Sequence, residues 1–280
     1  MKMNKKATHD FKVNDLPKNR KEVFFDCLKM RYGIIVSLGF MSVFFALPLV
    51  ICLLLRDINL SSLLADITNQ EFGEEQGYQL FYSLKMAYSL ALVPCLVIWG
   101  LGLAGVMYII RQLVWYEGIF FFSDFFEGIR KNWKAYSTSF LVLGLYNVEL
   151  TMLSYQKVSA VWYGIYLGAG FLLLIPIVLF VLQMSLVYKF SFRGSVKNAF
   201  LLYIGNVPKT LLAELSIALV FATMGIPHVL FKYVALLVMM LFLLPLILMG
   251  VVLYGFSLFD EYINKEQYPG LVKKGIFECF

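Results

Sequence analysis

Long runs of apolar residues recur along this chain of 280 residues, and they limit its fold more than any other feature. About 20 helical residues, at 1.5 Å each, are needed to cross the roughly 30 Å hydrocarbon core of a bilayer. Inside lipid, backbone polar groups must be hydrogen-bonded within the protein, which makes helices the expected structure. The pattern predicts an all-α membrane protein, a bundle of about six transmembrane helices. The six stretches are residues 33–55, 84–110, 137–156, 159–188, 208–225 and 229–256.

The composition excludes a water-soluble fold. Hydrophobic residues make up 60% of the chain and charged residues only 15%, whereas a soluble domain has about 45–50% and about 25%. The formal net charge of +6 would suggest nucleic-acid binding in a soluble protein. Here the basic residues follow the ends of the apolar stretches, so we expect no nucleic-acid partner and expect the lipid bilayer instead.

The distribution of Lys and Arg predicts the topology. Most of the 24 basic residues fall in the N-terminal flank, in residues 111–136, in residues 189–209 and in the C-terminal tail. With six spans these four segments lie on one side, and the positive-inside rule places that side, with both termini, in the cytoplasm. The opposite side keeps few basic residues, which are Arg56, Lys85, Lys157 and Lys232.

This topology divides the chain into three parts. Residues 1–32 are expected to be a basic cytoplasmic N-terminal tail, and residues 258–280 a cytoplasmic C-terminal tail. Residues 33–257 form the six-helix transmembrane domain, with an outer loop at residues 56–83.

The first cytoplasmic segment of interest, residues 119–133, has the pattern of an amphipathic helix. Ser123 or Asp124 is a candidate N-cap, and Phe126, Ile129 and Trp133 recur at helical spacing with basic residues between them. Such a helix is expected to lie in the membrane interface. We single out a candidate partner or interfacial motif, called the first motif: Phe122, Asp124, Phe125, Phe126, Arg130, Lys131, Asn132 and Trp133.

A second cytoplasmic motif precedes the fifth span. Its sequence F-R-G-S-V-K-N, residues 192–198, aligns with F-E-G-I-R-K-N, residues 126–132, which hints at a duplicated unit. The alternative is that interfacial helices in general recruit these residue types. The candidate residues of the second motif are Lys197, Asn198, Asn206, Pro208 and Lys209.

Together, residues 105–114, 122–133, 195–200 and 206–211 resemble the signatures of the YesL-like family, multi-pass membrane proteins of unknown function in bacteria. The resemblance implies a bacterial cell membrane and an accessory role in carbohydrate uptake. It also implies an ABC-transporter permease or a sensor kinase as partner. The chain differs from the family in its longer basic N-terminus and its outer loop at residues 56–83.

Two carboxylates fall inside predicted spans, Glu149 in the third and Glu214 in the fifth. An ionisable group within a membrane helix is costly, so each is a candidate for cation binding or proton relay. The alternative is that each reaches a nearby interface or pairs with a neighbour such as Asn147 or Lys209.

Enzymatic motifs are absent from the sequence. It contains no G-x-x-x-x-G-K-[ST], G-x-S-x-G or H-E-x-x-H pattern. Its two His and four scattered Cys give no metal-binding spacing. We therefore expect no catalytic residue, no cofactor and no metal. The leading interpretation is a non-catalytic accessory or regulatory membrane protein, and the alternative is a small secondary transporter with Glu149 or Glu214 on its ion or solute path.

Overall fold

The computed structural model describes residues 16–69, 73–156 and 158–277, and these ranges are helical with short connections and no strand. This confirms the all-α prediction. The helices are α1 (Arg20–Met30), α2 (Tyr32–Thr68), α3 (Glu74–Val114), α4 (Phe121–Tyr155), α5 (Ala160–Ala169), α6 (Ile175–Val187), α7 (Phe192–Gly205), α8 (Val207–Phe221), α9 (Val229–Phe259) and α10 (Lys265–Gln267). Single π-helical turns follow α5 (Gly170–Leu174) and α9 (Asp260–Asn264), and 3₁₀ turns occupy Ala222–Gly225 and Pro269–Leu271.

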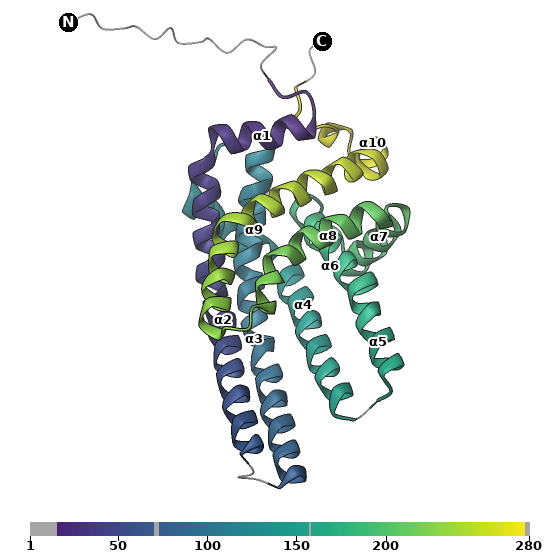
Figure 1. Ribbon diagram of the computed structural model, residues 1–280. Coiled ribbons are helices and arrows are strands. Elements are labelled where there is room, and N and C mark those ends of the chain that lie inside the picture. The colour runs from purple at the N-terminus through teal and green to yellow at the C-terminus, as the bar shows by residue number, and fades with distance from the viewer. Residues whose placement is uncertain (1–15, 70–72, 157, 278–280) are drawn as a thin grey trace, which may run out of the picture.

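The bundle has two distinct ends (Figure 1). Helices α1 and α10 lie at one end, with the first and last described residues, and we call it the terminal end. The α2–α3 and α4–α5 connections lie at the opposite end, the hairpin end. The α2–α3 hairpin reaches furthest in that direction, well past the α8–α9 connection.

Five helical segments of the described chain are long and apolar enough to cross a membrane. They are Tyr32–Thr68, Glu75–Val114, Ala160–Val187, Val207–Gly225 and Val229–Gln267. The third predicted span, residues 137–156, lies in α4, which has the length but not the apolarity, because Asn147 and Glu149 interrupt its apolar half.

Helices α2 and α3 are much longer than the spans predicted within them. With 37 and 41 residues they extend about 55 Å and about 60 Å, roughly twice the thickness of a bilayer core. The segment expected as an outer loop is therefore a helical hairpin, except for residues 70–72, which lie outside the described residues. Contacts between its two arms hold it: Gly77 lies against Ile67, and the Asn59 amide donates to the Tyr88 hydroxyl at 2.5 Å.

The centre of the bundle is the α3–α4 interface near the terminal end. Ala104, Val106 and Ile109 of α3 are fully buried. Glycines on both helices permit close approach: a Cβ on Gly105 would lie 2.7 Å from the Phe125 ring, and one on Gly128 would lie 2.5 Å from the Tyr108 Cβ. Small residues at such positions let membrane helices pack closely.

The two predicted tails are folded against each other in part. Helix α1 lies within the predicted N-terminal tail and buries Val23 and Cys27, four residues apart on one face. Arg20 forms an ion pair with Asp260 at 2.7 Å, and the Phe277 amide donates to the Pro17 carbonyl. The sequence prediction of a basic tail rested on the positive charge of this segment and missed the apolar face of α1. Residues 1–15 and 278–280 of the predicted tails lie outside the described residues.

Burial raises the pKa of the Cys27 thiol to about 11. A thiol in this environment is unreactive at neutral pH, which fits a packing role for α1.

Candidate functional site

The first motif forms the opening turns of α4 and is not a separate interfacial helix. Helix α4 runs without a break from Phe121 to Tyr155. Its N-cap is Phe120, not Ser123 or Asp124 as predicted, and the Asp124 carboxylate accepts a hydrogen bond from the Phe120 amide at 2.7 Å. This bond satisfies a backbone donor that would otherwise lack a partner. Because α4 continues without a break into its apolar half, no additional helix ends, with their unpaired backbone N–H and C=O groups, are created between the motif and the span.

The residues of this motif divide into a buried group of three and an exposed group of five. Phe125 is fully buried between α3 and α4, and the Asn132 amide donates to the Gly128 carbonyl at 3.0 Å. The exposed members are Phe122, Phe126, Arg130, Lys131 and Trp133. Capping and helix packing therefore explain the three buried members, and only the five exposed members can meet a partner or lipid.

The second motif forms α7 and the start of α8. Asn206 has φ −140° and separates the two helices, and its carbonyl accepts from the Thr210 amide. Pro208 stands in the first turn of α8, where its missing N–H costs nothing. Lys197 and Lys209 are exposed, and Asn198 is half-buried. Unlike the first motif, this segment breaks before the apolar helix begins.

One cavity of about 630 Å³ at the terminal end, which we call the lysine groove, is lined by residues 131–133 of the first motif and by Phe192 and Ser195 of the second cytoplasmic segment. The candidate residues of the second motif do not line it. It lies between α4, α6 and the start of α7. Its charged lining residues are all cationic, and they are Lys131, Lys134 and Lys189. Aromatic side chains complete its wall, namely Trp133, Tyr188, Phe190 and Phe192.

The charged side chains that line the lysine groove are all cationic, and one of them, Lys131, is paired with the Glu127 carboxylate at 2.6 Å. A hydrogen bond to Glu127 raises the pKa of Lys131 above its ordinary value, so Lys131 is cationic at neutral pH. Burial likewise raises the pKa of the Tyr188 hydroxyl, which therefore remains neutral. No carboxylate is among the described residues that line the groove. Together these features suit an anionic group with an apolar neighbour.

Glu214 is buried in α8, with only 3% of its surface exposed. Neither of its carboxylate oxygens has a hydrogen-bond partner among the described residues. Burying a carboxyl group without a partner costs free energy, so this position is hard to explain by packing alone. The predicted alternative, a pair with Lys209, is not present in the structure.

Glu149 has a different environment. It is exposed on α4 and accepts a hydrogen bond from the Tyr166 hydroxyl of α5. The Tyr166 ring stacks on the Tyr146 ring, with their centroids 4.9 Å apart. The interaction ties α4 to α5. Glu149 and Glu214 have no hydrogen-bond partner in common among the described residues. Neither lines the lysine groove or the second cavity, which is described below.

A third group of charged residues, at the hairpin end, was not expected from the sequence. The Asp57 carboxylate of α2 accepts hydrogen bonds from the Lys232 ammonium at 2.7 Å and the Tyr233 hydroxyl at 2.9 Å, both on α9. It also pairs with the neighbouring Arg56 guanidinium at 2.9 Å. One carboxylate therefore holds two cations.

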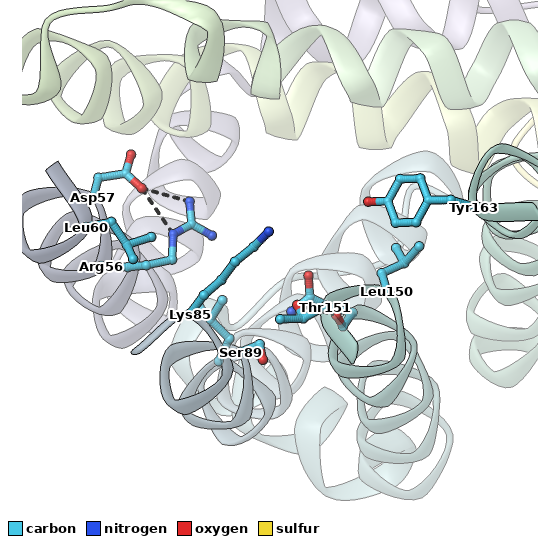
Figure 2. Close-up of a pocket in the computed structure, with 10 residues that line it drawn as sticks. Arg56, Asp57, Leu60, Lys85, Ser89, Leu150, Thr151 and Tyr163 are labelled. Carbon is cyan, nitrogen blue, oxygen red and sulfur yellow. Dashed lines mark hydrogen bonds and ion pairs between the residues drawn. The ribbon is translucent and has the colours of Figure 1, made fainter. Parts of the chain in front are cut away.

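Beside this group lies a second cavity, of about 350 Å³, which we call the hairpin-end cavity (Figure 2). Its lining residues come from α2, α3, α4 and α5, and they are Arg56, Asp57, Leu60, Lys85, Ser89, Leu92, Asn147, Leu150, Thr151 and Tyr163. The only sequence signal was that the few basic residues of the opposite side stand at the ends of apolar stretches. Which helix ends are neighbours depends on packing, and the sequence pattern does not give it.

In the described part of the chain, no three His, Cys, Asp or Glu side chains are grouped so that they could hold a metal ion. Comparison with protein-family models, with curated proteins and with solved structures finds no match. The arguments that follow therefore rest on the residues themselves.

Proposed function

We propose that this chain is a six-span protein of a bacterial cell membrane, with α4 as the third span and both termini in the cytoplasm. Two observations support this topology. Helix α4 lies beside α3 and runs from the terminal end to the hairpin end, where its C-terminus lies (Figure 1). The terminal end carries most of the described Lys and Arg residues, as expected for a cytoplasmic face.

We further propose that the protein is a non-catalytic accessory or regulatory component that binds another membrane protein through the lysine groove. The carrying observation is the groove itself, with three lysines, four aromatic side chains and no lining carboxylate. The resemblance to the YesL-like family suggests a carbohydrate-uptake system, with a permease or sensor kinase as the partner.

The chemistry of the groove favours binding over catalysis. Lysines at neutral pH donate hydrogen bonds and attract anions, but they provide no general base and no activated nucleophile here. Aromatic rings supply apolar contact area next to the charges. An acidic segment of a partner with an adjacent apolar residue matches this surface, and we take that as the occupant.

The test is affinity purification of the full chain from its native membrane in mild detergent, with partners identified by mass spectrometry. The variant reverses two groove charges, Lys134→Glu with Lys189→Glu. The matched control reverses two exposed charges of the same end that belong to neither motif and do not line the groove, Lys21→Glu with Lys29→Glu on α1.

We expect a permease or kinase to be recovered with the unchanged chain and the control, and to be lost with the groove variant. Recovery that survives reversal of the groove charges would contradict the proposal. Recovery of the chain with anionic lipid alone would also contradict it, because the groove would then be a lipid site.

Glu214 supports a second candidate function, a small secondary transporter with an intramembrane carboxyl group on the ion or solute path. Its side chain is buried without a partner. Near it, the Tyr203 hydroxyl donates to the Leu172 carbonyl in the π-helical turn between α5 and α6. Interrupted helices of this kind occur at transporter sites.

Reconstitution into liposomes with an ion-flux assay separates the two functions. Transport that is abolished by Glu214→Gln and retained by Glu149→Gln would favour the transporter, because Glu149 is exposed and already hydrogen-bonded. Absence of flux in every form favours the accessory role.

A further inference from the structure

The basic residues of the hairpin end are few, and the structure gathers them in one place. In the described ranges this end has three, Arg56 on α2, Lys85 on α3 and Lys232 on α9. They come from three helices separated widely in sequence. Arg56 and Lys85 line the hairpin-end cavity, and Lys232 binds Asp57 in its wall.

The charge around the hairpin-end cavity is not balanced. Asp57 is the only carboxylate among the described lining residues, and it is shared between Arg56 and Lys232. Lys85 makes no hydrogen bond or ion pair with another described residue, and its ammonium stands 5.8 Å from the Tyr82 ring centroid. Arg56, Lys85 and Lys232 are thus balanced by a single carboxylate, and the N–H donors of the Lys85 ammonium remain available to a ligand.

The neutral lining residues supply further hydrogen-bonding groups. Figure 2 shows the Lys85 ammonium and the Tyr163 hydroxyl directed toward the space between α2 and α5. The Thr151 hydroxyl donates to the Asn147 carbonyl at 3.0 Å. The side chains of Asn147 and Tyr163 form no hydrogen bond with another described residue. Unpaired donors beside unbalanced cations are the features by which proteins recognise oxyanions.

We infer that the hairpin-end cavity binds a phosphate group, with Lys85 and Arg56 as its charged contacts and Tyr163 as a neutral donor. Asp57 orients Arg56 and links the wall to α9. The volume of about 350 Å³ lies at the small end of the roughly 300–1,000 Å³ found for small-molecule sites. The ligand is therefore a small phosphate ester or the headgroup of an anionic lipid. This inference does not depend on the lysine groove or its partner.

The experiment is calorimetric titration of the purified full chain in a phosphate-free maltoside detergent, with inorganic phosphate as the probe. We expect saturable binding that weakens about tenfold or more in Lys85→Gln, which removes one charge-assisted contact. Lys85→Arg should restore most of the affinity. The matched control is Lys29→Gln, an exposed lysine of α1 at the other end, which should bind as the unchanged chain does.

Tyr163→Phe provides an independent check, because it removes a single hydroxyl that no described residue uses. We expect a smaller loss, of a few-fold. If phosphate does not bind saturably, or if Lys85→Gln and Tyr163→Phe both bind as tightly as the unchanged chain, the inference is overturned.

A second arm identifies the source of the phosphate. Native mass spectrometry with added phosphatidylglycerol, in the same detergent, reports lipid adducts. Adducts that are lost in Lys85→Gln and kept in Lys29→Gln would assign the site to a lipid headgroup. Phosphate binding without such adducts would assign it to a soluble phosphate ester.

Discussion

The two ends of the bundle carry positive charge for different reasons. At the terminal end, lysines are numerous and many are exposed, such as Lys131, Lys134 and Lys197. At the hairpin end the described cations are few, and Lys232 is largely buried, with 13% of its side chain exposed and a carboxylate at 2.7 Å. The first distribution is what membrane topology alone produces. Under the proposed topology the second is not, since the positive-inside rule disfavours basic residues on the outer side.

This difference shows which charges need a specific explanation. A cation that obeys the positive-inside rule can be placed by insertion of the helices alone. A cation that stands on the other side and is held by a buried network has to be maintained by stability or by a ligand. The predictions below test that distinction.

The largest effect is expected when the carboxylate of the hairpin end is removed. Asp57→Asn leaves Arg56 and Lys232 close together without their shared anion, and breaking such a pair costs about 3 kcal/mol of unfolding free energy. Thermal denaturation of the purified chain in detergent measures it. The control is Asp66→Asn, further along α2, which forms no ion pair with a described residue. Equal melting temperatures for the two variants would show that the network does not hold the fold.

Helix α9 supplies residues to both ends, so loosening its contact with α2 should affect the whole molecule. A Cβ on Gly39 would lie 1.8 Å from the Leu241 carbonyl oxygen, a backbone atom that cannot move aside easily. We expect Gly39→Ala to cost about 2 kcal/mol of unfolding free energy.

The matched control for that prediction is Gly33→Ala, also in α2, where nothing lies within 4 Å of an added Cβ. It should be neutral or stabilising by up to about 1 kcal/mol, since alanine favours helix. Equal melting temperatures of the two variants would argue against the α2–α9 packing described here.

At the terminal end, the corresponding carboxylate is Asp260, which accepts from Arg20 at 2.7 Å and from Asn264 at 2.8 Å. Asp260→Asn should cost about 1.5 kcal/mol, less than Asp57→Asn, because Arg20 keeps its bond to the Lys274 carbonyl. Limited proteolysis should also cut α1 faster. Glu261→Gln, exposed beside it, serves as the control. Unchanged proteolysis of Asp260→Asn would mean that α1 is held by its apolar face alone.

The smallest effect is expected for the exposed pair of the terminal end. Glu127→Gln removes the 2.6 Å ion pair with Lys131, but surface pairs of this kind contribute little because solvent and salt screen them. We expect no measurable change in Tm. A decrease as large as that of Asp260→Asn would mean that these lysines are held by structure as well as topology.

Hydropathy predicted where the apolar helices lie but not where helices end. The predicted spans start close to helix starts at Val207 and Val229, since both follow a clear change in polarity. The extension of α2 past residue 55 and the extension of α3 before residue 84 were missed. A hydropathy pattern detects the part of a helix that lipid would cover, whereas the rest is held by contacts such as Gly77 with Ile67.

The site was less predictable than the fold. The sequence singled out Glu214 and Glu149 for the same reason, yet one is buried without a partner and the other is exposed and paired with Tyr166. The Asp57–Lys232 pair joins residues 175 positions apart, and only the packing of α2 against α9 creates it. Such contacts depend on which helices pack side by side, and the pattern of a single sequence does not predict that.

The central claim is that the two ends face opposite sides of a membrane, which requires α4 to span it. Ser123 lies in the first turn of α4 and Ser159 follows its C-terminal end, and both are exposed. Single cysteines at these positions, in a chain without other cysteines, can be labelled in right-side-out vesicles with a membrane-impermeant maleimide. We predict that Ser159→Cys is labelled from outside, together with Ser62→Cys of the α2–α3 hairpin, and that Ser123→Cys is labelled only after permeabilisation. Labelling of Ser123→Cys and Ser159→Cys from the same side would contradict the claim.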